Sequence, residues 1–256
     1  MKIVVLDDSK TVLLTIYALL EELGVSDECI SLFSDGGKAL EHIEQNGADI
    51  IFSDINMPGM DGFEFVGRLF ALSQQFVSML FIVSADEHCG DINHMKHIGA
   101  KRFLRKPINS KHFNHFVAHE IARVDKRDKE LDTLQKMVEN EVAPKTKSDA
   151  TDYEALAMKI GIKVKHIPAL IESFLEEAEA IIKTLHTIWD SNEYATIERC
   201  AHSLKGSAGN MQFSELYEMA RELEFSAKNC NEEFDYVGHG DKMKQEIRLL
   251  SNQWGQ

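Results

Sequence analysis

The 256-residue chain is long enough for two compact domains, because a single domain commonly holds about 100–200 residues. Its net charge of −14 divides almost evenly, since residues 1–120 hold 10 Lys and Arg against 17 Asp and Glu, and residues 148–256 hold 11 against 19. Neither half offers the basic face that binding to nucleic acid requires, so we expect no nucleic acid partner.

The cysteines and the apolar runs bear on where the protein resides. Cys29, Cys89, Cys200 and Cys230 form no CxxC pair, and the first ten residues are too acidic for a secretory signal peptide. We therefore expect a cytoplasmic protein with reduced thiols. No apolar run approaches the ~18–20 residues that a membrane span needs, so no membrane partner is expected.

The first half of the chain alternates short apolar runs with amphipathic segments, a pattern typical of a parallel sheet covered by helices on both faces. The expected strands are Ile3–Asp7, Cys29–Phe33, Asp49–Ser53, Met79–Ser84 and Arg102–Arg105. Apolar residues between the first two strands recur at helical spacing from Val12 to Leu23. This alternation predicts an α/β domain with a doubly wound, flavodoxin-like five-stranded parallel sheet, whose ligands bind at the carboxyl ends of the strands.

Residues 123–148 differ from both halves because they are rich in charge and low in apolar side chains. Their thin apolar stripe consists of Val124, Leu131, Leu134, Val138 and Val142. It predicts a helical linker that ends near Pro144, since proline disfavours helix in the residue before it. Two interpretations of the stripe stay open: a solvated linker helix, or a surface that pairs two chains into a homodimer.

From Thr151 onward every strong signal is helical. Apolar residues step by three and four from Ile167 to Ile188, and Pro168 is tolerable in a first turn. Further helices are expected over about Asn192–Met211, from a Ser214 cap to about Ala227, and over about Asp241–Leu250. Together they predict an all-α, up-and-down four-helix bundle.

Acidic residues stand where two of the expected strands end. Asp7 and Asp8 close the first strand and Asp54 follows the third, so the sheet brings three carboxylates to one crevice. Two carboxylates ~4 Å apart repel by ~4 kcal/mol at an effective dielectric constant of 20, so the cluster demands a cation. Hard oxygen ligands suit Mg²⁺, and Lys106 can reach the same pocket. With the Ser84 hydroxyl at the fourth strand, the set suits attack by a carboxylate on phosphorus.

The segments VLDDS, SDINMPGMDGFEF, VSA and RKP, taken together, resemble a response-regulator receiver domain over residues 1–122. The resemblance implies that Asp54 is the phosphoacceptor. It also implies that Asp8, Asp54 and the Asn56 carbonyl bind Mg²⁺, with Asp7 helping through water.

The same resemblance assigns the residues around the phosphoryl group. It implies that Ser84 and Lys106 hold this group and that Phe103 turns inward with Ser84 on phosphorylation. Serine stands at position 84 where the family more commonly has threonine, which keeps the hydroxyl and loses a methyl group. The family also implies a cis peptide bond before Pro107.

A second motif, AHSLKGSAGNM, lies on an expected helix with His202, Lys205, Gly206 and Gly209 on one face. A glycine in a helix interior costs ~1 kcal/mol, so we interpret the two glycines as clearing space around the imidazole. The neighbouring apolar face packs into the bundle, which leaves His202 toward solvent. A neutral imidazole nitrogen is a competent nucleophile, and Lys205 can neutralise phosphoryl charge.

This motif resembles the histidine phosphotransfer (HPt) domain, which would cover residues 149–256. The resemblance implies that His202 is the phosphoacceptor. Gln212 departs from the family pattern, which usually has glycine after the apolar residue.

The two resemblances predict a two-component phosphorelay protein that accepts a phosphoryl group on Asp54 and carries or exchanges one on His202. Expected partners are a sensor histidine kinase and other receiver or HPt proteins, besides an intramolecular contact between the two domains. No segment resembles a kinase domain or a basic helix-turn-helix, so we expect neither kinase activity nor a DNA-binding output. Two alternatives stay open: a switch in which the receiver controls access to His202, and a phosphate sink.

Overall fold

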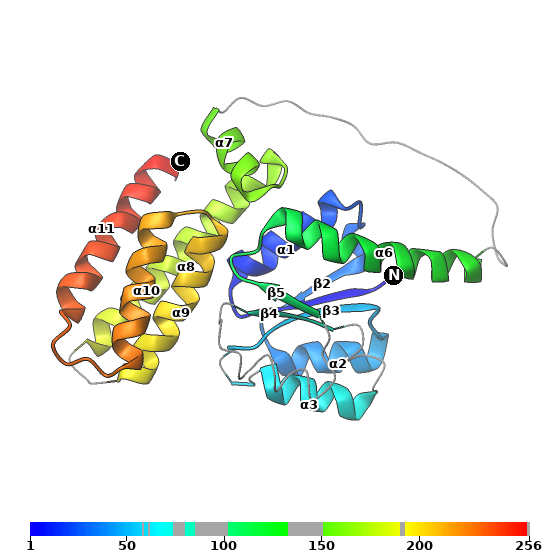
Figure 1. Cartoon of the computed structure of the whole chain (residues 1–256), viewed down its shortest axis with the longest axis horizontal. Helices are drawn as coiled ribbons and strands as arrows, with labels where there is room; N and C mark the ends of the chain where they lie inside the picture. The colour runs from blue at the N-terminus through cyan, green and yellow to red at the C-terminus, as the bar shows by residue number, and fades with distance from the viewer. Residues whose placement is uncertain are drawn as a thin grey trace.

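The computed structural model describes residues 1–57, 59–60, 62–73, 80–84, 102–132, 151–189 and 193–254. An α/β unit and a helical bundle lie side by side in it (Figure 1). No helix in these ranges is both long enough and apolar enough to cross a membrane. Residues 133–148 of the expected linker lie outside the described residues.

The α/β unit is built on a five-stranded parallel sheet in the order β2-β1-β3-β4-β5, which confirms the predicted doubly wound fold. Its strands are β1 (Ile3–Leu6), β2 (Ile30–Phe33), β3 (Ile50–Asp54), β4 (Leu80–Ser84) and β5 (Arg102–Arg105). Strands β1, β3 and β4 are buried along their whole length, because helices cover both faces of the sheet.

Two pairs of helices cover the sheet. Helices α1 (Lys10–Glu22) and α6 (Ser110–Asp132) lie on one face, and α2 (Gly36–Asn46) and α3 (Gly62–Leu72) lie on the other (Figure 1). Helix α1 begins after Ser9, whose side chain caps it by accepting a hydrogen bond from the Val12 amide. Helix α6 continues into the expected linker as far as Asp132.

The bundle consists of α8 (Ile167–Ile188), α9 (Tyr194–Asn210), α10 (Ser214–Lys228) and α11 (Tyr236–Trp254), preceded by α7 (Thr151–Ile160). Helix α8 has the predicted bounds, with Pro168 in its first turn. The predicted cap at Ser214 was wrong, because Phe213 occupies the N-cap position and no side chain bonds to the helix end.

The predicted start of the last helix at Asp241 was also wrong, since α11 begins five residues earlier, at Tyr236. Gly238 and Gly240 therefore lie inside the helix, although glycine usually favours a helix end. Packing explains Gly240, because a Cβ atom there would overlap the ring of Trp189. This contact joins residues far apart in the chain, so helical periodicity does not reveal it.

Helix α1 joins the two units. It packs against the sheet and also against α8 and α9 of the bundle. One hydrophobic cluster contains Val12 and Ile16 of α1 together with Leu170, Phe174 and Leu204 of the bundle. The two units therefore share a continuous apolar core, and the carboxyl ends of the strands lie close to α9.

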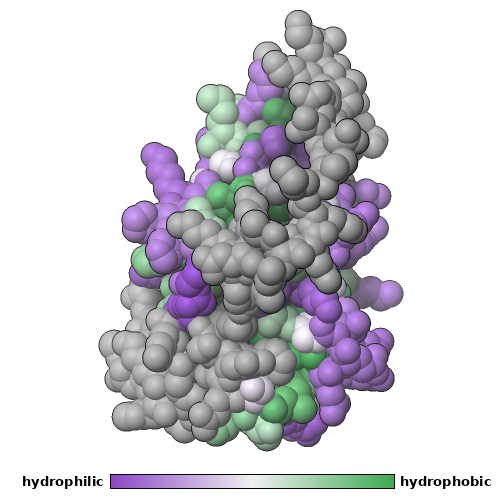
Figure 2. Space-filling model, turned by 90° about the vertical axis from the view of Figure 1, so that its right-hand side faces the viewer, coloured by the Kyte–Doolittle hydropathy of each residue, from purple (hydrophilic) through white to green (hydrophobic). Residues whose placement is uncertain are grey.

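Hydrophilic and hydrophobic residues are unevenly distributed on the part of the surface that one view shows. On the face shown in Figure 2, hydrophilic residues, in purple, lie along the edges of the molecule and hydrophobic residues form smaller green areas. The large hydrophobic side chains found exposed are Phe70, Leu72, Phe116, Met158, Phe225, Val237 and Leu249. These side chains lie on α3, α6, α7, α10 and α11.

Candidate functional site

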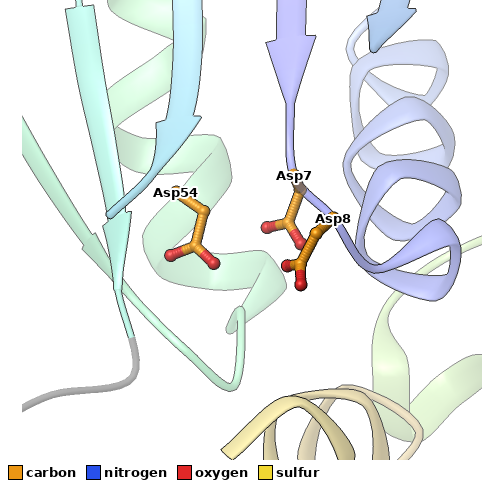
Figure 3. A group of neighbouring side chains, drawn as sticks. All are labelled: Asp7, Asp8 and Asp54. Atoms are coloured by element: carbon orange, nitrogen blue, oxygen red, sulfur yellow. The ribbon is translucent and has the colours of Figure 1, made fainter. Parts of the chain in front are cut away.

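Three carboxylates meet at the carboxyl ends of β1 and β3. Asp7 and Asp8 follow β1, Asp54 ends β3, and one oxygen of each lies within 4.8 Å of the others. Figure 3 shows Asp7 and Asp8 pointing toward the side of Asp54, next to a helix of the bundle. Asp7 and Asp54 are buried and Asp8 is half-buried. The strand order thus creates the acidic crevice that the sequence predicts.

Lys106 supplies positive charge to this cluster. It follows β5, is buried, and its Nζ lies 2.7 Å from Asp7 Oδ2 and 2.9 Å from Asp54 Oδ2. Burial lowers the pKa of Lys106, but the carboxylates of Asp54 and Asp7 outweigh burial and raise this pKa above its usual value. The backbone carbonyl of the buried Ser84 accepts a hydrogen bond from the Lys106 amide at 2.8 Å, which places the end of β4 beside the site.

The acidic cluster holds more negative charge than Lys106 compensates. Burial raises the pKa of Asp8 to about 6; Lys106 opposes this rise, and Asp54 and Glu177 add to it. Burial likewise raises the pKa of Asp7, against the effect of Lys106. This is the electrostatic setting in which a divalent cation binds favourably, and carboxylate oxygens are the ligands that Mg²⁺ prefers.

We expect Asp8→Asn to stabilise the protein at pH 8 without divalent cations. The pKa of Asp8 is about 6 in the folded protein and about 3.9 in an unfolded chain, so the folded protein binds more protons between these values. The free energy of unfolding therefore falls as pH rises through this window, and the variant avoids a loss of about 2–3 kcal/mol. Urea unfolding at pH 4 and pH 8 measures the gain.

The matched control is Glu44→Gln, which removes one negative charge from an exposed position of α2. Its stability is expected to stay within about 0.5 kcal/mol of the wild type at both pH values. A gain for Asp8→Asn that is equally large at pH 4 would contradict the electrostatic explanation.

The structure also places three further residues that the sequence singles out. Asn56, in the loop after β3, is exposed, and its Nδ2 lies 3.3 Å from His202 Nε2 in the bundle. Phe103 lies half-buried on β5 and packs against the hydrophobic cluster beneath α2 and α3. The peptide bond between Lys106 and Pro107 is cis, as the family resemblance implies.

His202 lies on α9 and faces the α/β unit. Its side chain is only 16% exposed, and its Nε2 contacts Asn56. The expectation that His202 points toward solvent was therefore wrong. The face of α9 that the bundle leaves free is covered by the α/β unit, and a helical pattern within the bundle does not reveal this packing.

Glu224 of α10 is a site residue that the sequence analysis missed. Its Oε1 lies 2.5 Å from His202 Nδ1, and its Oε2 pairs with Lys205 Nζ. Burial raises the pKa of Glu224, but the hydrogen bonds from His202 and Lys205 outweigh burial and lower it. An ionised carboxylate only accepts hydrogen bonds, so we assign the proton of the neutral imidazole to Nδ1 and the lone pair to Nε2, which then accepts the hydrogen bond from Asn56 Nδ2. Nothing in the segment ARELEF distinguishes Glu224 from Glu222.

Of the two glycines near His202, Gly209 makes room for the α/β unit. A Cβ atom at Gly209 would lie 3.2 Å from Pro107 Cβ and 3.2 Å from the Tyr217 ring. A Cβ atom at Gly206 would lie 3.9 Å from Lys106 Cδ. The interpretation that both glycines clear space around the imidazole is therefore corrected: Gly209 allows α9 to approach the loop that follows β5, whereas a Cβ atom at Gly206 would make only an ordinary van der Waals contact.

Gln212 follows α9 in a left-handed conformation with a φ of 60°. Glycine adopts this conformation without steric cost, which accounts for the family's preference for glycine here. The Gln212 Nε2 donates a hydrogen bond to the Gly209 carbonyl at 3.0 Å, so the turn keeps its geometry with a larger residue.

Both candidate phosphoacceptors line one cavity of about 740 Å³ between the two units. The α/β unit contributes Asp8, Asp54, Asn56 and Lys106, and the bundle contributes His202, Gly206 and Glu224. A carboxylate, a lysine and an imidazole with an unprotonated Nε2 therefore face one shared cavity, an arrangement suited to moving a phosphoryl group between Asp and His.

Comparison with known families agrees with this chemistry. Residues 3–118 match the family model of the response regulator receiver domain, and residues 169–253 match that of the Hpt domain. The chain therefore carries the signalling modules of two-component phosphorelay systems. More particularly, it is a receiver domain followed by an HPt domain, and we use these names for the α/β unit and the bundle from here on.

The chain is similar to other proteins over part of their length. The sensory/regulatory protein RpfC of Xanthomonas campestris pv. campestris is 21% identical over 87% of this chain, and the sensor protein EvgS of Escherichia coli is 21% identical over 99%. The chain spans only 30% and 19% of these two relatives. The solved structure of the chemotaxis protein CheY4 of Vibrio cholerae is 25% identical and covers 49% of this chain and 96% of its own, with a TM-score of 0.39.

Proposed function

We propose that the chain relays a phosphoryl group within itself, between Asp54 of the receiver domain and His202 of the HPt domain. The observation that carries this proposal is that both side chains line one interdomain cavity. We assign residues 1–122 to the receiver domain, 123–148 to the linker and 149–256 to the HPt domain. The partners would be a sensor histidine kinase that supplies the phosphoryl group and a further receiver or HPt protein that takes it up.

A magnesium ion would be held by Asp8, Asp54 and the Asn56 carbonyl, with Asp7 helping through water. Three carboxylates within 4.8 Å offer the hard oxygen ligands that this small cation requires. When bound, Mg²⁺ neutralises charge on the phosphoryl oxygens. Lys106 pairs with Asp7 and Asp54, and its single positive charge compensates only part of the negative charge of the three carboxylates.

The first step forms an acyl phosphate on Asp54. The carboxylate attacks the phosphorus atom of the donor, the new P–O bond forms, and the donor leaves with the electron pair of the broken bond. Lys106, 2.9 Å from Asp54 Oδ2, would neutralise a phosphoryl oxygen, and the Ser84 hydroxyl would donate to another. Phe103 would then move inward with Ser84 and report the phosphorylated state.

The second step passes the group to the HPt domain. The lone pair of His202 Nε2 attacks phosphorus, a P–N bond forms, and the P–O bond to Asp54 breaks, so that Asp54 leaves as a carboxylate. The proton on Nδ1 stays in place and binds Glu224 at 2.5 Å, so the carboxylate compensates the positive charge that develops on the ring. Lys205, held by the same carboxylate, adds positive charge near the transferred group.

Labelled phosphate from acetyl phosphate or a kinase, supplied to wild type, Asp54→Ala and His202→Ala, tests the proposal. We expect acid-labile, alkali-stable label on His202 in the wild type, none on His202 in Asp54→Ala, and acyl phosphate on Asp54 in His202→Ala. Label on His202 that persists in Asp54→Ala would exclude Asp54 as its obligatory source. Absence of label at both positions would overturn the phosphotransfer function.

A second function is favoured by the coverage of His202, whose side chain is 16% exposed beneath the receiver domain. In this alternative, phosphate on Asp54 gates access of other receivers to His202 and does not pass to it. Gating predicts that a separate phosphorylated receiver labels His202 faster after Asp54 has been phosphorylated with unlabelled phosphate. A phosphate sink, which drains phosphoryl groups from other receivers, would use the same chemistry but have a different role in the signalling network.

A further inference from the structure

We propose that Glu177, on helix α8, is the positioning residue that docks the HPt domain on the receiver domain and so sets His202 over the acidic cluster. The proposal rests on the transfer between Asp54 and His202 argued above. Glu177 is half-buried, and its two carboxylate oxygens bind groups of different domains.

On the receiver side, Glu177 binds the N-terminal end of α1. Its Oε2 accepts a hydrogen bond from Ser9 Oγ at 3.0 Å and lies 3.5 Å from the amide nitrogen of Thr11. Amides in the first turn of a helix have no intrahelical partner, and a negative charge there is stabilising. The Ser9 amide donates in turn to Asp7 Oδ1 at 3.0 Å, so one residue connects Glu177 with the acidic cluster.

On the HPt side, Glu177 binds the helix that carries the phosphoacceptor histidine. Its Oε1 accepts hydrogen bonds from Ser207 Oγ at 2.6 Å and from Ser203 Oγ at 3.4 Å. Ser203 directly follows His202, and Ser207 lies about one turn further along α9. The hydroxyls of Ser9 and Ser207 are also 3.0 Å apart. One carboxylate therefore fixes α9 relative to the residue that follows the acidic cluster.

The neighbouring ion pair at the N-terminal end of α1 is weaker than the contacts of Glu177. The neighbouring Glu176 reaches Lys10 Nζ at 3.5 Å, but both side chains are about two-thirds exposed (65% and 66%), and such surface pairs contribute little. Hydrogen bonds to a charged acceptor away from water are about twice as strong as neutral ones. Glu176→Ala is therefore a matched control one residue away on the same helix.

A second contact between the domains serves as an independent reporter of docking. The Ile108 amide of the receiver donates to Asn210 Oδ1 of the HPt domain at 2.7 Å, and Glu177 makes no part of this contact. If Glu177 holds the domains together, its loss exposes the Ile108 amide as well as the Thr11 amide. If Glu177 is only a local partner of α1, its loss accelerates the exchange of the Thr11 amide and leaves that of the Ile108 amide unchanged.

The test is amide hydrogen exchange of the full chain, together with transfer of label from Asp54 to His202, for wild type, Glu177→Ala, Glu177→Gln and Glu176→Ala. We expect Glu177→Ala to accelerate exchange of both amides and to slow the transfer at least about tenfold, while acetyl phosphate still labels Asp54. Glu177→Gln keeps one carbonyl acceptor and should recover part of the loss. Glu176→Ala should behave as wild type.

Unchanged exchange of the Ile108 amide in Glu177→Ala, or an equal effect of Glu176→Ala, would overturn the positioning role. If Glu177→Ala does not fold, Glu177→Gln takes its place in the comparison with the wild type. We then expect faster exchange of both the Ile108 and the Thr11 amide in Glu177→Gln. The exchange is measured on the unphosphorylated protein, so it requires no phosphoryl transfer. If the wild type fails to pass label to His202, the proposed function fails, and the exchange data still decide the role of Glu177.

Discussion

Replacing Lys106 by methionine is expected to abolish labelling of Asp54 and to destabilise the protein by about 3–5 kcal/mol at pH 8. The ammonium group is buried between Asp7 and Asp54, at 2.7 and 2.9 Å. Methionine keeps most of the volume of the side chain but leaves two buried carboxylates without their cation. The loss of stability should be smaller at pH 5, because Asp8, whose pKa burial raises to about 6, then binds a proton and the acidic cluster carries less negative charge.

Urea unfolding at the two pH values and acetyl phosphate labelling measure these effects. Lys10→Met is the matched control, because the side chain of Lys10 is 66% exposed and its pair with Glu176 contributes little. Equal losses of stability in the two variants would contradict the structural role of Lys106. Normal labelling of Asp54 in Lys106→Met would contradict its role in phosphoryl transfer.

Glu224→Gln is expected to slow transfer to His202 by about 10–100-fold, a change of about 1.4–2.7 kcal/mol in the activation barrier, while Asp54 is labelled normally. The carboxylate accepts the Nδ1 proton of His202 and binds Lys205 with its other oxygen. An amide can replace one of these contacts but carries no negative charge. The positive charge on the phosphorylated imidazole then has no partner, and the orientation of the ring is less fixed.

Single-turnover transfer from Asp54 to His202 measures this effect. Glu222→Gln is the control, because Glu222 is exposed on the same helix two residues away. Transfer at the wild-type rate in Glu224→Gln would show that the hydrogen bond to Nδ1 does not assist the reaction. A loss of Asp54 labelling in this variant would instead indicate a defect in the receiver domain.

The acidic crevice could be predicted from the sequence because its residues are fixed by local patterns. Asp7, Asp8 and Asp54 stand at the ends of apolar strands, and the parallel sheet brings strand ends together wherever the helices pack. The motif around His202 is likewise contained in a single helix, α9.

Glu224 and Glu177 could not be predicted in this way. Each is a half-buried carboxylate on a helix with several other glutamates, and its role comes from groups that belong to other helices. The coverage of His202 and the neighbours of Gly209 depend on how two domains dock. Hydrophobic periodicity describes one helix at a time, so it does not contain this information.

The position of α1 has a consequence for how the protein unfolds. Its apolar residues, among them Val12 and Ile16, belong to a single cluster that reaches from the receiver sheet into the HPt bundle. Separating the domains exposes part of this cluster to water, at about 25 cal/mol for each Å² of apolar surface. Each domain therefore stabilises the other, and thermal unfolding of either domain lowers the stability of the other.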